Sequence, residues 1–155
     1  MLLKPYHKKD LCEIIKLFYN TVHFVNAADY TPAQLNAWAP ASLNKEDWAT
    51  SLAKNYTLVA WQNGQITGFA DIEPSGYLNR LYIHKDFQHK GIATLLTDAL
   101  EEYAFSLGIK RVYTHASITA KPFFIKRGYH VKEQNQVKRG EQILINYTME
   151  KQLIL

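Results

Sequence analysis

The chain has 155 residues, of which 47% are hydrophobic and 21% are charged, and its formal net charge is +4 at pH 7. These values are typical of one globular domain that buries its own core, so we expect a single domain over residues 1–155. No apolar run approaches the roughly 20 residues that a membrane-spanning helix needs, which argues against a membrane protein.

The amino-terminal segment and the cysteine content bear on the cellular compartment. Residues 1–5 lack the apolar stretch and the small-residue cleavage site of a secretory signal. The single cysteine, Cys12, cannot form an internal disulfide, and its place in a helical pattern predicts a buried, inert thiol. We therefore expect a cytoplasmic protein and assign Cys12 no catalytic role.

The first third of the chain is predicted to be mainly helical. Apolar side chains recur at helical spacing from residue 8 to residue 24. Thr31 followed by Pro32, and Asn44 followed by two acidic residues two and three positions later, are typical helix starts. In chain order we expect a strand at residues 2–6, a helix at 8–24, a short helix that begins at Thr31-Pro32 within the turn-rich segment 27–40, and another short helix at 43–54.

From residue 56 the hydrophobic period changes from about 3.6 residues to 2, which indicates strands. Asn63-Gly64 and Pro74-Ser75-Gly76 are turn sequences, so the first three strands form an antiparallel meander. The order of elements predicts one α+β domain. We expect strands at 56–61, 65–73, 77–84, 111–116, 129–137 and 142–149, and helices at 94–107 and 120–126.

A glycine-bearing turn, Gln88-His89-Lys90-Gly91-Ile92-Ala93, lies between a predicted strand and an amphipathic helix. Such a turn directs unpaired backbone N–H groups at one point, where the helix dipole adds positive potential. The pattern is typical of a phosphate-binding site, although an isolated match is equally typical of a structural turn.

The positive charge is concentrated in the carboxy-terminal half. Between Gly108 and Gly140 there are eight Lys or Arg residues and one acid, Glu133. This balance would suit an anionic ligand, either nucleic acid or a phosphorylated small molecule. Charge alone, however, is more typical of an ordinary solvated surface, so other features must support a ligand. The basic residues are scattered and form no nucleic-acid-binding motif, so we expect no nucleic-acid partner.

Two motifs in order point to a known family. Gln88, Gly91 and Ala93 match a Gln/Arg-x-x-Gly-x-Gly/Ala signature. About thirty residues later, a segment of the Ala-x-x-Phe-Tyr-x-x-x-Gly-Phe type is supplied by Ala120, Phe123, Phe124, Gly128 and Tyr129. With the order of elements, these motifs resemble the GNAT superfamily of N-acetyltransferases over essentially the whole chain. Pro122-Phe123-Phe124 resembles an uncharacterised bacterial branch of that superfamily.

This resemblance implies a GNAT-like fold, in which helices flank a mixed, mostly antiparallel central sheet of about seven strands. It also implies acetyl-CoA as co-substrate, with its pyrophosphate at the glycine turn and its pantetheine arm along the preceding strand. The cofactor-binding residues that the resemblance implies are Leu81, Tyr82, Ile83, Gln88, His89, Lys90, Gly91, Ile92, Ala93, Thr94 and Phe124.

The implied reaction is direct attack of an amine on the thioester, and it needs a proton for the departing sulfur. Many superfamily members place a tyrosine, the proton donor, where this chain has Phe124, which has no proton to give. Tyr82, Tyr113 and Tyr147 are candidates for the missing acid, and we favour Tyr147 on the last strand. The alternative for each tyrosine is simple packing.

The candidate bases for the amine proton are Asp71, Glu73 and His115. Asp71 lies in an otherwise apolar strand, where a carboxylate is costly unless it is paired or functional. His115 lies near the end of a strand, where a structural histidine is the alternative. The expected catalytic set is therefore Tyr147, Asp71 and His115.

The acceptor wall is expected in the helical region after the first strand, as the resemblance implies. Asp29, Tyr30 and Trp38 are the candidate substrate-binding residues there, and an acidic Asp29 or Asp71 would favour a cationic amine. The expected partner is a small-molecule or peptide amine, with no membrane partner and a possible homodimer.

Two other classes of protein are a metal enzyme and a protein without catalysis. Six histidines without paired ligand spacing and a single cysteine argue against a metal site, so no metal is expected. Phe124 leaves open a different class, a catalytically silent acyl-CoA-binding regulatory module. Acceptor-dependent release of CoA separates that module from an enzyme.

Overall fold

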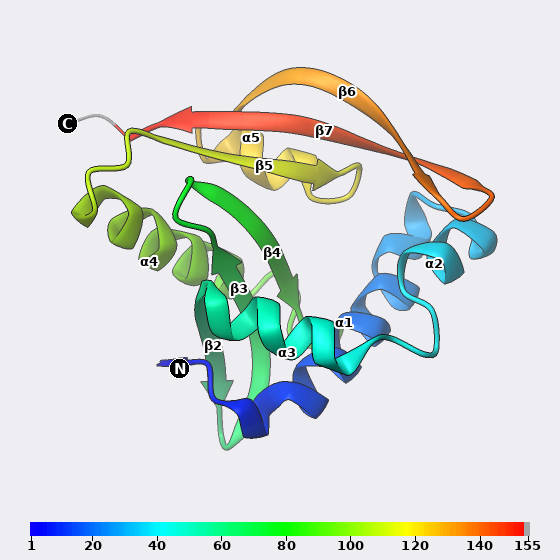
Figure 1. The fold of residues 1–155 in the computed structure, drawn as a ribbon, viewed down its shortest axis with the longest axis horizontal. Coiled ribbons are helices and arrows are strands. Elements are labelled where there is room, and N and C mark those ends of the chain that lie inside the picture. Colours follow the sequence, from blue (N-terminus) through cyan, green and yellow to red (C-terminus); the bar gives the residue numbers. More distant parts are fainter. Residues whose placement is uncertain (154–155) are drawn as a thin grey trace.

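A seven-stranded sheet forms the centre of the structure, a computed structural model that describes residues 1–153 (Figure 1). The strand order is β1-β2-β3-β4-β5-β7-β6, and every neighbouring pair is antiparallel except β4 and β5. The strands are β1 (Leu2–Pro5), β2 (Tyr56–Gln62), β3 (Gln65–Ile72), β4 (Tyr77–Ile83), β5 (Arg111–Ser117), β6 (His130–Arg139) and β7 (Gln142–Gln152).

Helices cover both faces of this sheet and divide the core in two. On one face lie α4 (Ile92–Ser106) and α5 (Lys121–Lys126), which contribute side chains such as Leu96, Leu100 and Phe124. The other face is covered by α1 (Leu11–Phe24), α2 (Pro32–Trp38) and α3 (Lys45–Lys54), with two short 3-10 helices at Lys8–Asp10 and Asn26–Ala28. Among residues 1–153, no helix is long and apolar enough to cross a bilayer.

The predicted α+β fold with about seven strands and flanking helices is confirmed, and each predicted element is present. The bounds differ by a few residues; α4, for example, begins at Ile92 and not at Thr94. The expectation of a buried Cys12 is wrong, because its thiol is exposed. Residues 12 and 16 stack on the same side of α1, and Lys16 is also exposed, so this side faces solvent.

The two parallel strands separate soon after they begin. β4 and β5 pair only at Tyr77 with Tyr113 and at Leu78 with Thr114. The Thr114 hydroxyl donates to the Leu78 carbonyl oxygen at 2.8 Å, at the last point of contact. Beyond it the strands diverge, as Figure 1 shows, so the sheet splits into a half made of β1 to β4 and a half made of β5, β7 and β6.

A carboxylate on α4 connects these two halves. Glu101, with a side chain only 11% exposed, accepts a hydrogen bond from the Tyr129 hydroxyl at 2.9 Å. Lys151 of β7 donates to its other oxygen at 2.8 Å, and Arg127 contacts it from the end of α5. Burial, and then the charge of Glu101, raise the pKa of Tyr129, which keeps this phenol protonated and donating.

Replacing this carboxylate is expected to loosen the two halves. Glu101→Gln removes the charge that three donors share, and we expect it to lower the free energy of unfolding by about 1–3 kcal/mol in urea denaturation. Glu102→Gln, at the exposed neighbouring position, is the matched control, expected within about 0.5 kcal/mol of wild type. Equal effects of the two variants would contradict this role of Glu101.

Candidate functional site

Two cavities meet where β4 and β5 diverge. The larger has a volume of about 590 Å³ and runs from this opening to the turn before α4. The smaller has a volume of about 270 Å³ and lies towards α2, α3 and the hairpin of β6 and β7. The residues that line both cavities are Trp38, Asn79, Tyr82, His115 and Ser117. A molecule in one cavity would therefore meet a molecule in the other at this shared wall.

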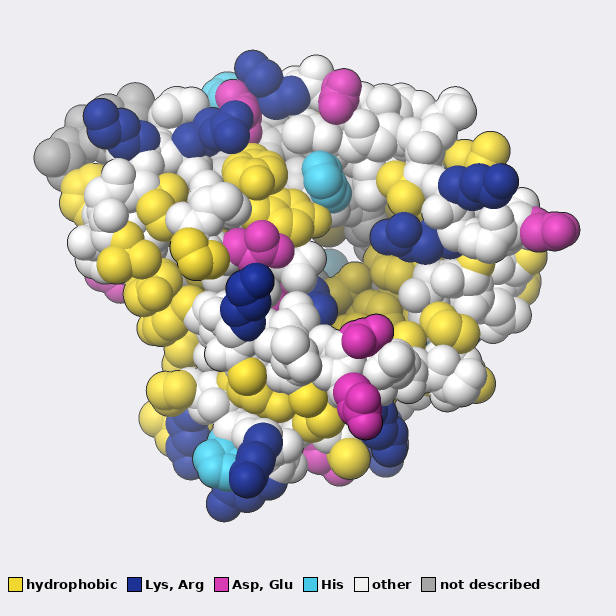
Figure 2. Space-filling view, viewed as in Figure 1, with side chains coloured by type: hydrophobic (Ala, Val, Ile, Leu, Met, Phe, Trp, Pro, Cys, Tyr) yellow, Lys and Arg dark blue, Asp and Glu magenta, His cyan; other side chains and the backbone are white. Residues whose placement is uncertain are grey.

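The opening is visible on the surface of the protein. Figure 2 shows a hollow right of the centre, over the region where Figure 1 shows β4 and β5 apart. Hydrophobic side chains form its floor, and Lys or Arg side chains lie beside it. Acidic side chains near the lower rim in this view are not among the residues that line either cavity.

The turn before α4 presents unpaired backbone donors to the larger cavity. Gly91, the residue that precedes the helix, has a φ of +82°, and His89 also has a positive φ, of 60°. No side chain caps the helix, and its first internal backbone bond runs from Leu95 N–H to Gly91. The N–H groups of residues 92–94 therefore lack helical partners and can bind an anion.

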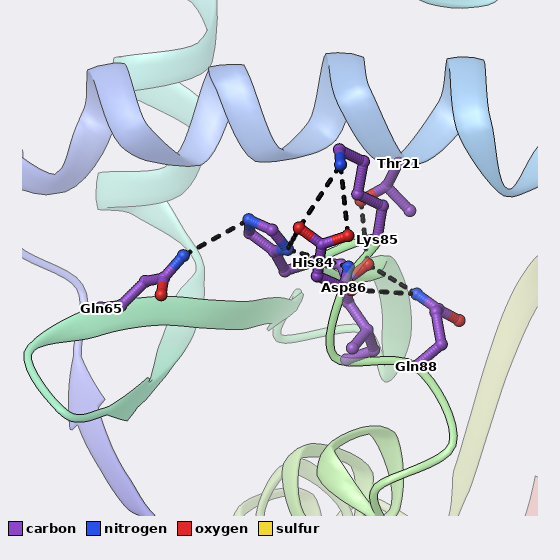
Figure 3. A network of polar contacts seen from close by, with 7 residues as sticks. Thr21, Gln65, His84, Lys85, Asp86 and Gln88 are labelled. Carbon is purple, nitrogen blue, oxygen red and sulfur yellow. Dashed lines mark hydrogen bonds and ion pairs between the residues drawn. The ribbon is translucent and has the colours of Figure 1, made fainter.

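Side-chain contacts hold this turn against the end of β4 (Figure 3). The Gln88 amide donates to the Ile83 carbonyl oxygen at 2.8 Å, and Thr21 of α1 donates to the same oxygen at 2.9 Å. The backbone N–H of Asp86 donates to His84 Nδ1 at 3.0 Å. These contacts fix the position of the turn relative to the strand and to α1.

The cofactor-binding residues expected from the sequence line the larger cavity with one exception. Leu81 to Ile83, Gln88, His89, Gly91 to Thr94 and Phe124 all do so. Lys90 does not; its ammonium lies 5.8 Å from the centre of the Phe87 ring. Thr21, Val25 and Asn26 also line this cavity, because the end of α1 and the residues after it lie beside it; no local sequence pattern indicates them.

Phe124 is packed among other aromatic rings. Its side chain is 3% exposed, and its ring lies 5.3 Å from that of Phe123 and 5.0 Å from that of Tyr129. The nearest tyrosine hydroxyl in this cluster, that of Tyr129, already donates to Glu101. The aromatic cluster beside the larger cavity thus forms part of its wall, and its one hydroxyl is already engaged in a hydrogen bond.

The smaller cavity combines aromatic walls with a held arginine. Arg80 of β4 donates to the Asp71 carboxylate and, at 3.0 Å, to the Ser51 hydroxyl, and its guanidinium carbon lies 4.6 Å from the centre of the Trp48 ring. The aromatic side chains that line this cavity are those of Phe18, Tyr30, Trp38, Trp48, Tyr77 and Tyr82.

Asp71 lies behind this arginine and lines neither cavity. Its side chain is fully buried and accepts hydrogen bonds from Asn55 and Arg80, while its other oxygen has no partner among the described residues. Burial raises the pKa of Asp71, and the neighbouring Arg80 opposes that shift. The structure therefore places Asp71 where it holds Arg80, outside the lining of both cavities.

His115 is the expected catalytic residue that the structure brings to the opening. It lies on β5 just past the last paired residue and lines both cavities. Its Nδ1 is 3.2 Å from the hydroxyl of Tyr77, a partner that the sequence did not indicate. Its Nε2 has no hydrogen-bond partner among residues 1–153. Within the described residues, one nitrogen of the ring is thus free of hydrogen bonds.

Tyr147 and Asp29, two further expected site residues, lie outside the lining of both cavities. The Tyr147 ring lies 4.2 Å from the Lys121 ammonium, on the face of β7 that packs towards α5. Asp29 accepts a hydrogen bond from Thr119 at 2.7 Å. Asp29 and Asp71 thus both turn away from the smaller cavity, which removes the basis for expecting a cationic acceptor.

Tyr30 and Trp38, the other expected substrate-binding residues, do line the smaller cavity. The Tyr30 hydroxyl donates to the Ile145 carbonyl oxygen at 2.6 Å and accepts from the Ile118 N–H at 2.9 Å. Burial raises the pKa of Tyr30, in keeping with a phenol that stays protonated. Tyr30 therefore ties the segment before α2 to the β5–β7 half of the sheet.

A β-bulge lies at the centre of the shared wall. Asp71 pairs with Arg80 and Ile72 pairs with Leu78, so Asn79 has no register partner on β3. Bulged residues re-aim their backbone groups and are frequent beside active sites. Because β5 has already diverged here, Asn79 lies between the two cavities without a strand on that side.

The comparisons with known proteins agree with this architecture. Residues 26–153 match the family described as the acetyltransferase (GNAT) domain. The chain is 29% identical over 147 residues, covering 95% of it and 93% of the relative, to the uncharacterised N-acetyltransferase YafP of Escherichia coli K12.

Two solved structures are similar over nearly the whole chain. A GCN5-related N-acetyltransferase from Rhodopseudomonas palustris matches with a TM-score of 0.94 and 34% identity, over 97% of this chain and 94% of that one. YncA of Salmonella typhimurium, solved with its cofactor acetyl-CoA, matches with a TM-score of 0.75 and 18% identity, over 100% and 95% of the two chains. This chain therefore belongs to the GNAT superfamily of N-acetyltransferases and is an acyltransferase.

Proposed function

We propose that residues 1–155 form a single domain that moves an acetyl group from acetyl-CoA in the larger cavity to a primary amine in the smaller one. The observation that carries this proposal is the meeting of the two cavities at the opening between β4 and β5. The larger cavity ends at a phosphate-binding turn, and the smaller ends among aromatic side chains. The acceptor attacks the thioester directly, with no covalent enzyme intermediate.

The residues of the larger cavity fit the donor that this function requires. Backbone N–H groups of residues 92–94 would hold the pyrophosphate, and a Cβ added at Gly91 would meet nothing within 4 Å, so this side of the turn is open to a ligand. Residues 79–83 of β4 lie beyond its pairing with β5 and can offer backbone groups to the amide-bearing arm.

His115 serves this reaction as the group that moves the proton. The amine reacts in its neutral form, and as its nitrogen bonds to the carbonyl carbon, Nε2 of His115 takes one of its protons. The carbon–sulfur bond then breaks, and the imidazolium returns that proton to the departing thiolate. Histidine most often plays both parts near neutral pH, and Tyr77 orients the ring through Nδ1.

In this proposal, backbone N–H groups polarise the thioester carbonyl. The bulged residue, Asn79, lies in the wall that both cavities share, and an N–H group aimed at the developing oxyanion lowers the barrier. Backbone donors do this without a cost of reorganisation during the reaction. Metal ions and further cofactors have no part in the proposed reaction.

The turn is tested by Gly91→Ala. Alanine tolerates a φ of +82° poorly, so the variant distorts the turn, and we expect the Kd for CoA in isothermal titration calorimetry to rise at least about fivefold. Gly108→Ala is the matched control, because Gly108 has a similar φ of +77° at the other end of α4 and lines neither cavity. Equal CoA affinities of the two variants would contradict the assignment of the turn.

Removal of the imidazole tests the proton path. His115→Ala is expected to lower kcat at least about 100-fold, measured as acceptor-dependent thiol release from acetyl-CoA, with the Kd for CoA within about twofold. His130→Ala, an exposed histidine of β6 outside both cavities, is the control and should turn over as wild type. Wild-type kcat in His115→Ala would exclude the proposed path, and CoA binding without any acceptor-dependent release would favour a regulatory module.

Tyr147, the residue that the sequence favoured as acid, is the alternative source of the thiol proton. Because it lies outside both cavities, we expect Tyr147→Phe to keep kcat within about threefold of wild type. A loss of about 100-fold in kcat, with unchanged CoA affinity, would instead assign the proton to Tyr147. Tyr82→Phe, measured alongside, reports on the tyrosine that does line both cavities.

A further inference from the structure

Arg80 is held in the wall of the smaller cavity by contacts on three sides. Asp71 and Ser51 each accept one of its N–H groups, and the ring of Trp48 stacks on its guanidinium. The side chain is 15% exposed, and that exposed part faces the cavity it lines. A guanidinium held in this way loses little freedom when it binds a ligand.

The guanidinium has donors to spare. Arginine carries five N–H groups, and two of them make the hydrogen bonds to Asp71 and Ser51. The other three have no hydrogen-bond partner among residues 1–153. A buried ion pair such as Arg80 with Asp71 adds little stability compared with apolar residues of similar size. Retaining a guanidinium here therefore points to a ligand for its free donors.

The charge around the smaller cavity favours an anion. Arg139, from the end of β6, is a second cation in its lining, and none of its described lining residues is Asp or Glu. Asp71, the nearest carboxylate to Arg80, is buried behind it and accepts its hydrogen bond from the far side. A cationic diamine would meet like charge at this wall, whereas a carboxylate would meet paired donors.

The remaining walls combine aromatic rings with polar groups, among them those of Asn79, Ser117 and Asn146. Six aromatic side chains line this cavity, and several of their rings contact one another, as Trp48 does with Phe18 at 4.7 Å between ring centres. Such a pocket binds a hydrophobic group through its buried area, while a few polar groups fix its orientation. The cavity volume of about 270 Å³ limits the acceptor to a small molecule or to the end of a longer one.

From these features we infer that the acceptor amine also carries a carboxylate and an apolar body, the chemistry of a hydrophobic amino acid, with the carboxylate bound by Arg80. This inference rests on the proposed function. The ammonium first loses one proton to solvent, and the neutral amine attacks the thioester. The new N–C bond replaces the C–S bond, the second proton passes through His115 to sulfur, and the products are the N-acetyl amino acid and CoA.

Three amines of the same body test the carboxylate. L-phenylalanine, L-phenylalaninamide and phenethylamine share the apolar ring and the amine, and only the first carries a carboxylate. We expect L-phenylalanine to bind CoA-saturated protein roughly 10- to 100-fold more tightly than the other two in calorimetry, and to show a matching advantage in kcat/KM for thiol release.

Variants of the arginine complete the test. The Arg80→Gln variant leaves Asp71 buried without its cation, so the double variant Asp71→Asn with Arg80→Gln is measured beside it, and in both the advantage of L-phenylalanine should vanish. Arg139→Gln is expected to reduce the advantage less than the Arg80 variants do. Lys138→Gln, an exposed neighbour that lines neither cavity, removes the same charge and should leave the advantage unchanged.

The outcomes separate this inference from the proposed function. If the three amines bind and react equally well, or if none of them binds, the carboxylate assignment is overturned. If L-phenylalanine binds more tightly through Arg80 but releases no CoA, the anion site stands and the proposed transfer to this amine fails. An advantage that persists in the double variant would also overturn the role of Arg80.

Discussion

The early separation of β4 from β5 is the constraint on which the rest of the structure depends. Strands stay together only while their backbone groups pair, and here the ladder ends after Leu78 and Thr114. Beyond that point β4 keeps β3 on one side and has no strand on the other. Its free backbone groups need partners, which in the proposed function a bound donor supplies. The opening is thus both a gap in the sheet and the candidate site.

Side-chain contacts on both faces join the two halves of the sheet on either side of this opening. On the face of α4 and α5, Glu101 contacts Tyr129, Arg127 and Lys151, which belong to the other half of the structure. On the opposite face, Tyr30 reaches β7 and the segment after β5 through its hydroxyl. Since each contact joins elements far apart in the chain, the two halves behave as one scaffold around the cavities.

These long-range contacts explain what could and could not be predicted. Local pattern was enough for the elements, because hydrophobic period and turn residues act over a few positions. It was also enough for the geometry of the glycine turn, because the unpaired N–H groups there come from consecutive residues. The lining contributed by the end of α1 depends on contacts between distant parts of the chain, such as the hydrogen bond from Thr21 to Ile83 across 62 positions of sequence. Nothing near residue 21 indicates it.

The same limit explains Asp71. A carboxylate in an apolar strand is expected to be paired or functional, and Asp71 is paired. The local pattern could not show which residue is its partner or which of the two lines a cavity. The bulge at Asn79 sets the register that places Arg80 opposite Asp71, with Ser51 and Trp48 of α3 around it. The carboxylate is therefore buried, and its partner Arg80, a cation, is the residue of the pair that lines the smaller cavity.

Phe124 shows how packing decides where the proton chemistry can lie. Its ring is 3% exposed among other aromatic rings, and the nearby phenol of Tyr129 is already committed to Glu101. A hydroxyl at position 124 would be buried without an evident partner, which costs free energy unless a ligand accepts its hydrogen bond. With phenylalanine there, the aromatic cluster has no additional buried hydroxyl that needs a hydrogen-bond partner, and its rings contribute packing. In the proposed function the proton then passes through the wall that both cavities share, where His115 lies.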